Sequence, residues 1–232
     1  MVVISILLAL ASAASAASIP RALTYPPLST SKGFYLVANI SDPAMDLDPP
    51  VHGQFFEGAH VGAGLNRAVL AADYGRVFYQ SATKDDTSHR VDTLFDMGTP
   101  PFPGSIGVEE TGVGDDNRKH EINANAGLSH SNIVFSDPKE TGYAFVDPAA
   151  VFGEEGFFAA CREGIPYYQN TIFNTVNWIS GDVEDAALFP GCVPITLLPQ
   201  CASLPPLPEG SMASHEYAQD IQCYEEVSAN NW

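Results

Sequence analysis

The sequence predicts an all-β protein, either a β-sandwich or a partly open β-barrel, with turn-rich loops and at most short helices. Glycine and proline contribute 19 and 18 of the 232 residues, and they are scattered between short apolar runs. Several runs alternate polar and apolar residues, whereas the helical period is rare. Short strands separated by closely spaced turn residues are typical of sandwiches and barrels.

Strands are expected wherever a short apolar run lies between turn residues. In 119–125, His120, Ile122 and Ala124 share one face and the polar residues share the other, which is typical of a strand with one face on a core. Residues 33–41 are apolar on both faces until Asn39, which predicts a central strand. The expected strands are 33–41, 51–57, 66–71, 75–82, 90–96, 119–125, 131–135, 142–147, 156–161, 171–179 and 193–198.

The remaining segments are expected to be loops, with one exception. Residues 99–104 and 203–210 are rich in proline, and residues 107–116 (GVEETGVGDD) are acidic and rich in glycine, with few apolar side chains to bury. Residues 214–227 fit a short helix and a strand equally well. No internal repeat or long linker divides the chain, so we expect a single β-rich domain over 18–232.

The first 17 residues resemble a secretory signal peptide. An apolar run is followed by Ala and Ser residues that offer cleavage sites near Ala16 or Ala17. The run is shorter than the ~20 apolar residues of a membrane-spanning helix. We therefore expect an exported protein, extracellular or associated with the cell wall, that is not held in a membrane after cleavage.

The chain is strongly acidic, with 10 Lys and Arg against 28 Asp and Glu and a formal net charge of −18. Phosphate backbones and anionic membrane surfaces repel such a chain. Nucleic acid is therefore not an expected partner.

Four cysteines lie in the C-terminal third, at Cys161, Cys192, Cys201 and Cys223. An even number in an exported chain predicts two disulfides, for which three pairings are possible. We favour Cys161 with Cys192 and Cys201 with Cys223. No CxxC pair is present, so a zinc site is a weaker interpretation.

The sequence contains no recognisable catalytic, cofactor or metal motif. It lacks a GxSxG nucleophile elbow, a HExxH pair, a P-loop and a GxGxxG turn. His52 and His60 bracket a predicted hairpin, but a metal site there would need a third ligand. Glycosidases need two carboxylates that face each other across a cleft, and among 28 acidic residues no pair is singled out by spacing. The candidates are Glu57, Glu109, Glu110, Glu121, Asp147, Glu154, Glu155 and Glu163.

Two other features bear on binding and modification. Tyr167, Tyr168 and Trp178 lie in or near residues 161–179 and are candidates for stacking on a ligand, although aromatic residues of β-proteins are more often core residues. Asn39-Ile40-Ser41 is an N-glycosylation sequon. A glycan on Asn39 would require that its side chain face solvent.

Five segments carry a resemblance to a known family: 33–39 (GFYLVAN), 60–64 (HVGAG), 77–80 (VFYQ), 122–127 (INANAG) and 192–201 (CVPITLLPQC). They resemble a family of small secreted proteins from filamentous ascomycete fungi. That family is defined by a domain of unknown function, and some members are labelled IgE-binding or cell-surface proteins. The resemblance implies an extracellular or wall-associated location and carries no catalytic residues.

The leading functional hypothesis is a non-catalytic extracellular or wall-associated protein, with a cell-wall polysaccharide or a host protein as its partner. The alternative is a secreted carbohydrate-active protein, lectin-like or a glycosidase, with a groove lined by aromatic rings and a pair of carboxylates.

Overall fold

The structure, a computed structural model, describes residues 27–40, 42–82, 92–112, 117–128, 133–135, 146–147 and 155–227. Its strands all belong to one hydrogen-bonded sheet, and its helical segments are short 3-10 turns, so the all-β prediction is confirmed. The strands are β1 (Leu28–Ser31), β2 (Gly33–Asn39), β3 (Phe55–Gly62), β4 (Leu65–Ala71), β5 (Phe78–Ser81), β6 (Asp92–Met97), β7 (Phe102–Gly112), β8 (Lys119–Ala126), β9 (Val134–Phe135), β10 (Val146–Asp147), β11 (Gly156–Ile165), β12 (Thr171–Ser180), β13 (Cys192–Ala202) and β14 (Ile221–Tyr224). The 3-10 turns are η1 (Pro43–Met45), η2 (Pro166–Tyr168) and η3 (Val183–Leu188).

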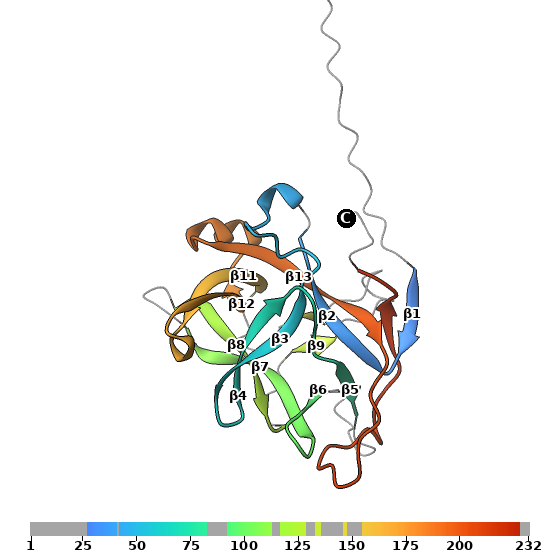
Figure 1. The fold of residues 1–232 in the computed structure, drawn as a ribbon. Coiled ribbons are helices and arrows are strands. Elements are labelled where there is room, and N and C mark those ends of the chain that lie inside the picture. Colours follow the sequence, from blue (N-terminus) through green and yellow to red (C-terminus); the bar gives the residue numbers. More distant parts are fainter. Residues whose placement is uncertain are drawn as a thin grey trace, which may run out of the picture.

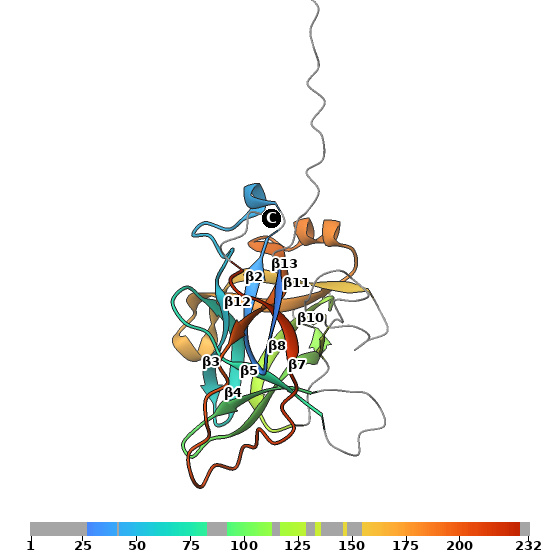
Figure 2. The same ribbon diagram turned by 90° about the vertical axis from the view of Figure 1, so that its right-hand side faces the viewer.

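Nine of these strands close into a barrel (Figure 1). The pairings run from β13 through β11, β12, β4, β8, β7, β6, β5 and β2 and return to β13. The barrel is therefore closed, whereas the sequence predicted either a partly open barrel or a sandwich. Strand β3 pairs along β4 and touches β2. Strands β1 and β14 extend the sheet beyond β13, with β1 at the edge of the molecule in Figure 1, and Figure 2 shows the barrel turned by 90°.

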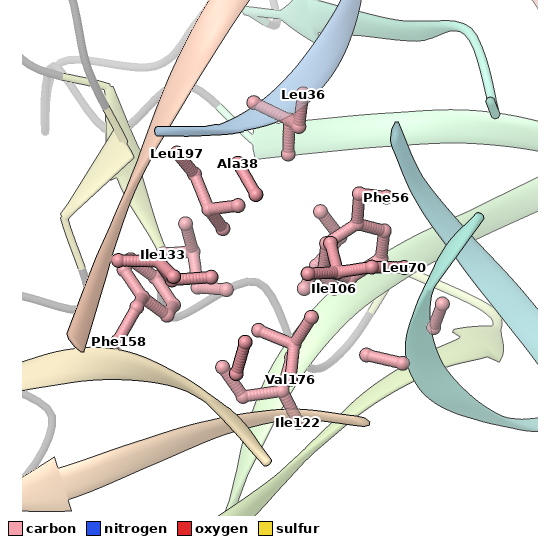
Figure 3. Packing of buried hydrophobic residues seen from close by; sticks show 14 of the residues in the cluster. Leu36, Ala38, Phe56, Leu70, Ile106, Ile122, Ile133, Phe158, Val176 and Leu197 are labelled. Carbon is pink, nitrogen blue, oxygen red and sulfur yellow. The ribbon is translucent and has the colours of Figure 1, made fainter. Parts of the chain in front are cut away.

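The core fills the inside of the barrel (Figure 3). Alternate residues of each strand point inward, among them Leu36 of β2, Ile122 of β8 and Val176 of β12. Strand β8 has the predicted alternation, with His120, Ile122 and Ala124 buried and their neighbours on the outer face. Strand β2 is the predicted central strand, and its side chains are buried on both faces except for the half-buried Tyr35.

Strand β7 contradicts the loop prediction for much of 99–104 and 107–116. Residues Phe102–Gly112 form a strand that pairs with β6 on one side and with β8 on the other. Backbone hydrogen bonds to two neighbouring strands hold this strand in place. Its apolar contribution to the core comes from Ile106 and Val108. Residues 113–116 lie outside the described residues. The undecided segment 214–227 contains β14 and no helix.

Both disulfides have the favoured pairing, Cys161 with Cys192 and Cys201 with Cys223. The first joins directly opposed residues of β11 and β13, and the second joins β13 to β14. Strand β13 is therefore tied covalently near each of its ends.

The predicted signal peptide, residues 1–17, lies outside the described residues. Within the described part of the chain, no helix has the length and apolar character that crossing a membrane requires.

We expect Ile122→Ala to lower the free energy of unfolding by about 2–5 kcal/mol, because Ile122 is fully buried and its removal leaves a cavity among close-packed side chains. The matched control is Ile172→Ala, since Ile172 is 54% exposed at the start of β12 and should change stability by about 0.5 kcal/mol or less. Urea unfolding with the disulfides intact measures both values. Equal losses would contradict the assignment of the core to the inside of the barrel.

Candidate functional site

The most distinctive polar site lies where strands β4, β8 and β12 meet, which we call the strand junction. Strand β12 pairs with β4 at Thr175 and then with β8 from Asn177 onward, while β4 pairs with β8 at Arg67. Val176 lies at the point where β12 changes partner. The backbone carbonyl groups at this point cannot all be satisfied by a regular strand ladder.

Arg67 supplies the missing donors. Its Nη1 donates to the carbonyl oxygens of Ile122 and Val176, at 2.8 and 2.7 Å, and its Nη2 donates to Asn177 Oδ1 at 2.6 Å. The side chain lies on the outer face of the barrel, yet Arg67 is only 5% exposed. One guanidinium group therefore joins β4 to both strands that diverge beside it.

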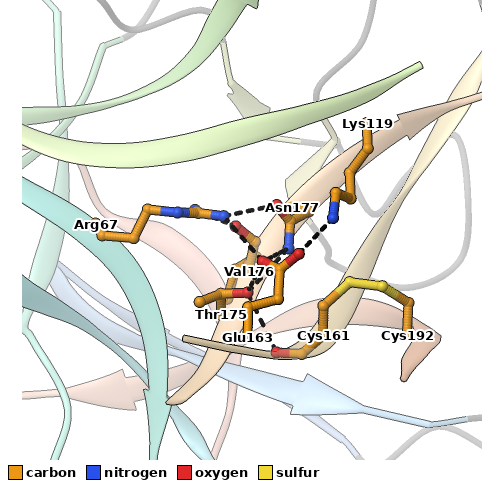
Figure 4. Close-up of a disulfide and its surroundings, with 8 residues drawn as sticks. All are labelled: Arg67, Lys119, Cys161, Glu163, Thr175, Val176, Asn177 and Cys192. Carbon is orange, nitrogen blue, oxygen red and sulfur yellow. Dashed lines mark hydrogen bonds and ion pairs between the residues drawn. A yellow bond between two sulfur atoms is a disulfide. The ribbon is translucent and has the colours of Figure 1, made fainter. Parts of the chain in front are cut away.

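Two carboxylates, those of Glu121 and Glu163, compensate the charge of Arg67, and Figure 4 shows Glu163 beside it. Arg67 Nε lies 3.5 Å from Glu121 Oε2, and Nη2 lies 3.6 Å from Glu163 Oε2. Burial lowers the pKa of Arg67, and the two carboxylates act in the opposite direction. An arginine stays charged even so, because its reference pKa is so high.

Glu163 is held in its ionised form. Burial alone would raise its pKa, but the hydrogen bond from Lys119, together with those from Thr175 Oγ1 at 2.5 Å and Asn177 Nδ2 at 3.2 Å, outweighs burial and lowers the pKa. Lys119 and Arg67 approach this carboxylate from opposite sides (Figure 4). The result is a connected network in which the charged groups of the junction have partners of opposite sign.

A groove of about 700 Å³ lies over the outer face of the junction. Its floor includes Arg67, Glu121 and Asn123, and its walls come from two hairpins. Leu65 stands on the β3–β4 hairpin, and Tyr167 stands on the β11–β12 hairpin. The volume lies within the range of pockets that bind small ligands.

The groove is better arranged for binding than for acid–base catalysis. Glu121 and Glu163 are the two carboxylates that converge, but the guanidinium group of Arg67 contacts both of them. A glycosidase needs one carboxyl group that stays protonated to act as the acid, whereas the lowered pKa of Glu163 keeps that group ionised. The hydroxyl of Thr175 donates to Glu163 and is buried, with 1% exposure.

The predicted stacking residues have three different positions. Tyr167 is 57% exposed at the groove wall, as a stacking residue would need. Tyr168 is half-buried and packs against Phe173, with 5.0 Å between ring centroids. Trp178 is 2% exposed and points into the barrel, so its assignment as a stacking residue is wrong. Its indole packs on Gly156, where an added Cβ would lie 2.3 Å from a ring atom.

The sequon residue Asn39 is also buried, with 6% exposure. It ends strand β2 opposite Thr196 of β13. The exposed side chain that a glycan on Asn39 would require is therefore not present in the folded chain, because strand pairing places Asn39 within the sheet. Ser41, the third residue of the sequon, lies outside the described residues.

His52 and His60 do not come together to form a metal site. His52 precedes β3 and accepts a hydrogen bond from the backbone of Ile40, whereas His60 lies near the other end of β3 and contacts Tyr167 edge to face. The extended part of the chain between them, from Phe55 to His60, alone spans roughly 17 Å. Among the described residues, no group of three or more His, Cys, Asp or Glu side chains could hold a metal ion.

The other candidate carboxylates are dispersed. Glu57 pairs with Arg76, whose Nε donates to Glu57 Oε1 at 2.9 Å. Glu109 also lines the groove, where it accepts a hydrogen bond from Asn123 at 2.5 Å. Glu155 is exposed. Glu154 lies outside the described residues, as do the side chains of Glu110 and Asp147.

A second polar cluster anchors the C-terminal segment. His215 Nε2 lies 2.8 Å from Asp96 Oδ2, and the His215 ring contacts the ring of Tyr79. Burial and the nearby charge of Asp96 raise the pKa of Tyr79, which therefore stays protonated. Beside it, Gln219 N donates to Gln80 O at 2.8 Å. These contacts fasten the segment after β13 to β5 and β6.

Comparison with known proteins identifies the family. A domain of unknown function, DUF7907, matches residues 31–201. The chain belongs to the DUF7907 family. The match spans the strand junction, the groove and the first disulfide, so all of the site described above lies within the DUF7907 domain.

A curated relative is similar over most of its length. The antigenic protein SchS34 of Stachybotrys chartarum is 34% identical over 215 residues, which cover 90% of this chain and 92% of the relative. No solved structure matches the chain significantly.

Sequence reasoning missed Arg67 and Lys119. The signal for Arg67 is present, since an arginine interrupts the apolar run LNRAVLA in a chain that has only 10 Lys and Arg in total. A cation in the middle of a buried strand needs acidic and carbonyl partners. The sequence does not indicate which strands would supply them.

We expect Arg67→Met to lower the free energy of unfolding by about 3–5 kcal/mol, because two carbonyl oxygens lose their donor and Glu163 loses a neighbouring cation. Urea unfolding at neutral pH gives the value. Arg162→Met is the control, since Arg162 is exposed and its guanidinium group donates to the backbone carbonyl of Asp48. A loss no greater than that of the control would show that the junction does not depend on Arg67.

The pH dependence of stability should report on Glu163. Because its folded-state pKa lies below the ordinary value of 4.5, ionised Glu163 stabilises the fold above that pH, and this contribution is lost as the pH falls through the lowered value. Glu163→Gln should therefore flatten the loss of stability between pH 5 and 3, relative to the wild type. Urea midpoints across this range measure it. Glu209→Gln, at an exposed loop position, should leave the wild-type slope unchanged.

Proposed function

We propose that this DUF7907 protein is an exported, extracellular or wall-associated protein that binds a ligand in the groove and does not catalyse a reaction. The observation that carries the proposal is the strand junction itself. Its ionisable groups are paired in their charged forms beneath an open groove. Such an arrangement is preorganised for contacts with a polar ligand, and the lowered pKa of Glu163 keeps this carboxylate from serving as a protonated acid.

Export is supported by three independent features. Residues 1–17 have the composition of a signal peptide. Two disulfides are typical of proteins that fold in an oxidising compartment. The similar protein of Stachybotrys chartarum is named an antigenic protein, which agrees with a location where other organisms meet it. Cell-wall polysaccharide or a host protein is the class of partner that this location favours, and the net charge of −18 disfavours nucleic acid.

The experiment is a binding and turnover screen with the full chain purified from the medium of a secreting host. The panel contains cell-wall polysaccharides and their soluble oligosaccharides, and products are analysed for every hit. We expect binding without product. Binding should weaken in Glu121→Gln, whose carboxylate lines the groove and is 42% exposed, and should be unchanged in Glu216→Gln, at an exposed site on the C-terminal segment.

Turnover that disappears in Glu121→Gln would overturn the proposal and make the protein a glycosidase. Retention of the chain inside the secreting host, with residues 1–17 uncleaved, would contradict the export part of the proposal separately.

A further inference from the structure

We infer that the ligand of the groove is a neutral saccharide, one of whose sugar rings stacks on Tyr167 while its hydroxyl groups donate to the carboxylate and amide oxygens of the floor. This inference rests on the proposed function, because it names the ligand class of the same groove. It follows from the unpaired hydrogen-bonding groups of the groove floor, the exposed ring of Tyr167 and the balance of charges beneath the groove.

The free polar atoms of the floor are mostly acceptors. Glu109 has one oxygen bound by Asn123, and Glu121 has one oxygen near Arg67, so each retains an oxygen without a partner among the described residues. Asn123 retains its amide oxygen in the same way. Asn125 accepts from Asn66 N at 2.8 Å and retains its amide NH₂ as a donor. A ligand that satisfies this floor must therefore be rich in donors, with at least one acceptor.

The wall adds an apolar surface. Tyr167 follows Pro166 on the β11–β12 hairpin, and its ring meets the rings of Tyr168 and His60 near 5.5 Å, at interplanar angles of 67° and 88°. Edge contacts of this kind orient the ring without covering both of its faces. With Leu65 on the opposite hairpin, the groove combines a held aromatic ring, an aliphatic side chain and a polar floor.

A sugar ring matches this combination. Its hydroxyl groups donate and accept hydrogen bonds around the edge, and its C–H groups form a flat apolar face that packs on an aromatic ring. An aliphatic ligand would leave the oxygens of the floor without donors, at a cost in desolvation.

The charge balance favours a neutral ligand over a cationic one. Arg67 and Lys119 already neutralise two of the three carboxylates near the floor. The guanidinium group of Arg67 also lies directly beneath the groove, where it would repel an ammonium or guanidinium group. The groove therefore offers hydrogen-bond acceptors without a net negative charge strong enough to attract a cation.

The test measures binding of the full chain to soluble oligosaccharides of glucose, N-acetylglucosamine and mannose between 50 and 500 mM NaCl. Supporting results are affinity for at least one of them that changes by about twofold or less over this range, and a loss of about tenfold or more in Tyr167→Ala. The matched control is Tyr74→Ala, at a tyrosine that is 66% exposed and does not line the groove. Tyr167→Phe should bind like the wild type, because stacking uses the ring.

The other outcomes separate the inference from the proposed function. Poly-lysine is the cationic probe of the same assay. If it binds, with an affinity that falls steeply with salt and is lost in Glu121→Gln, while no saccharide binds, the groove is a binding site but the saccharide inference is overturned. If saccharides bind equally to the wild type, Tyr167→Ala and Glu121→Gln, both the inference and the groove as the binding site are overturned. Circular dichroism of each variant verifies that it is folded.

Discussion

The closed barrel depends on the hydrogen bonds from Arg67 to two diverging strands. A sheet that closes on itself must end one pairing and begin another, and here β12 leaves β4 and joins β8 within three residues. The carbonyl oxygens of Val176 and Ile122 lie at this change of partner, and one guanidinium nitrogen of Arg67 donates to both. A planar group with several fixed donors can satisfy such a point, whereas an apolar side chain would leave the buried carbonyl groups without partners.

The remainder of the polar network follows from that arginine. A buried cation is tolerated only when nearby carboxylates and hydrogen-bond partners offset the cost of removing it from water. Glu121 and Glu163 provide the charge, Asn177 and Thr175 orient Glu163, and Lys119 completes its ion pairing. The same contacts keep Glu163 ionised, and Arg67 also holds the carboxylate of Glu121 at the groove. Stability and the proposed binding thus involve one set of residues, and the ion pairs of this set suit recognition better than proton transfer.

Much of the fold could be predicted because strand alternation is a local property. The alternation of 119–126 and the double-sided burial of Gly33–Asn39 both appear as predicted. Strand β7 could not be predicted in this way, because its glycines and acidic residues carry almost no hydrophobic period and the strand is held by backbone pairing on both sides. Trp178 shows the complementary error. A position in a predicted strand does not say whether the indole of Trp178 faces the core or the solvent. In the structure the indole points inward and packs on Gly156 of the neighbouring strand, where the missing side chain leaves room for it.

By itself, the sequence determined the all-β class, the acidic character, the presence of two disulfides and the polar face of 119–125. These follow from composition, from cysteine number and from the two-residue period of a strand, none of which requires knowledge of distant contacts. Only the tertiary structure decided that Arg67, Glu121 and Glu163 meet, that Tyr167 stands over them while Trp178 does not, and that Asn39 is buried. These residues come from strands up to about a hundred positions apart in the chain. Which strands become neighbours is set by barrel closure, and barrel closure is a property of the whole sheet.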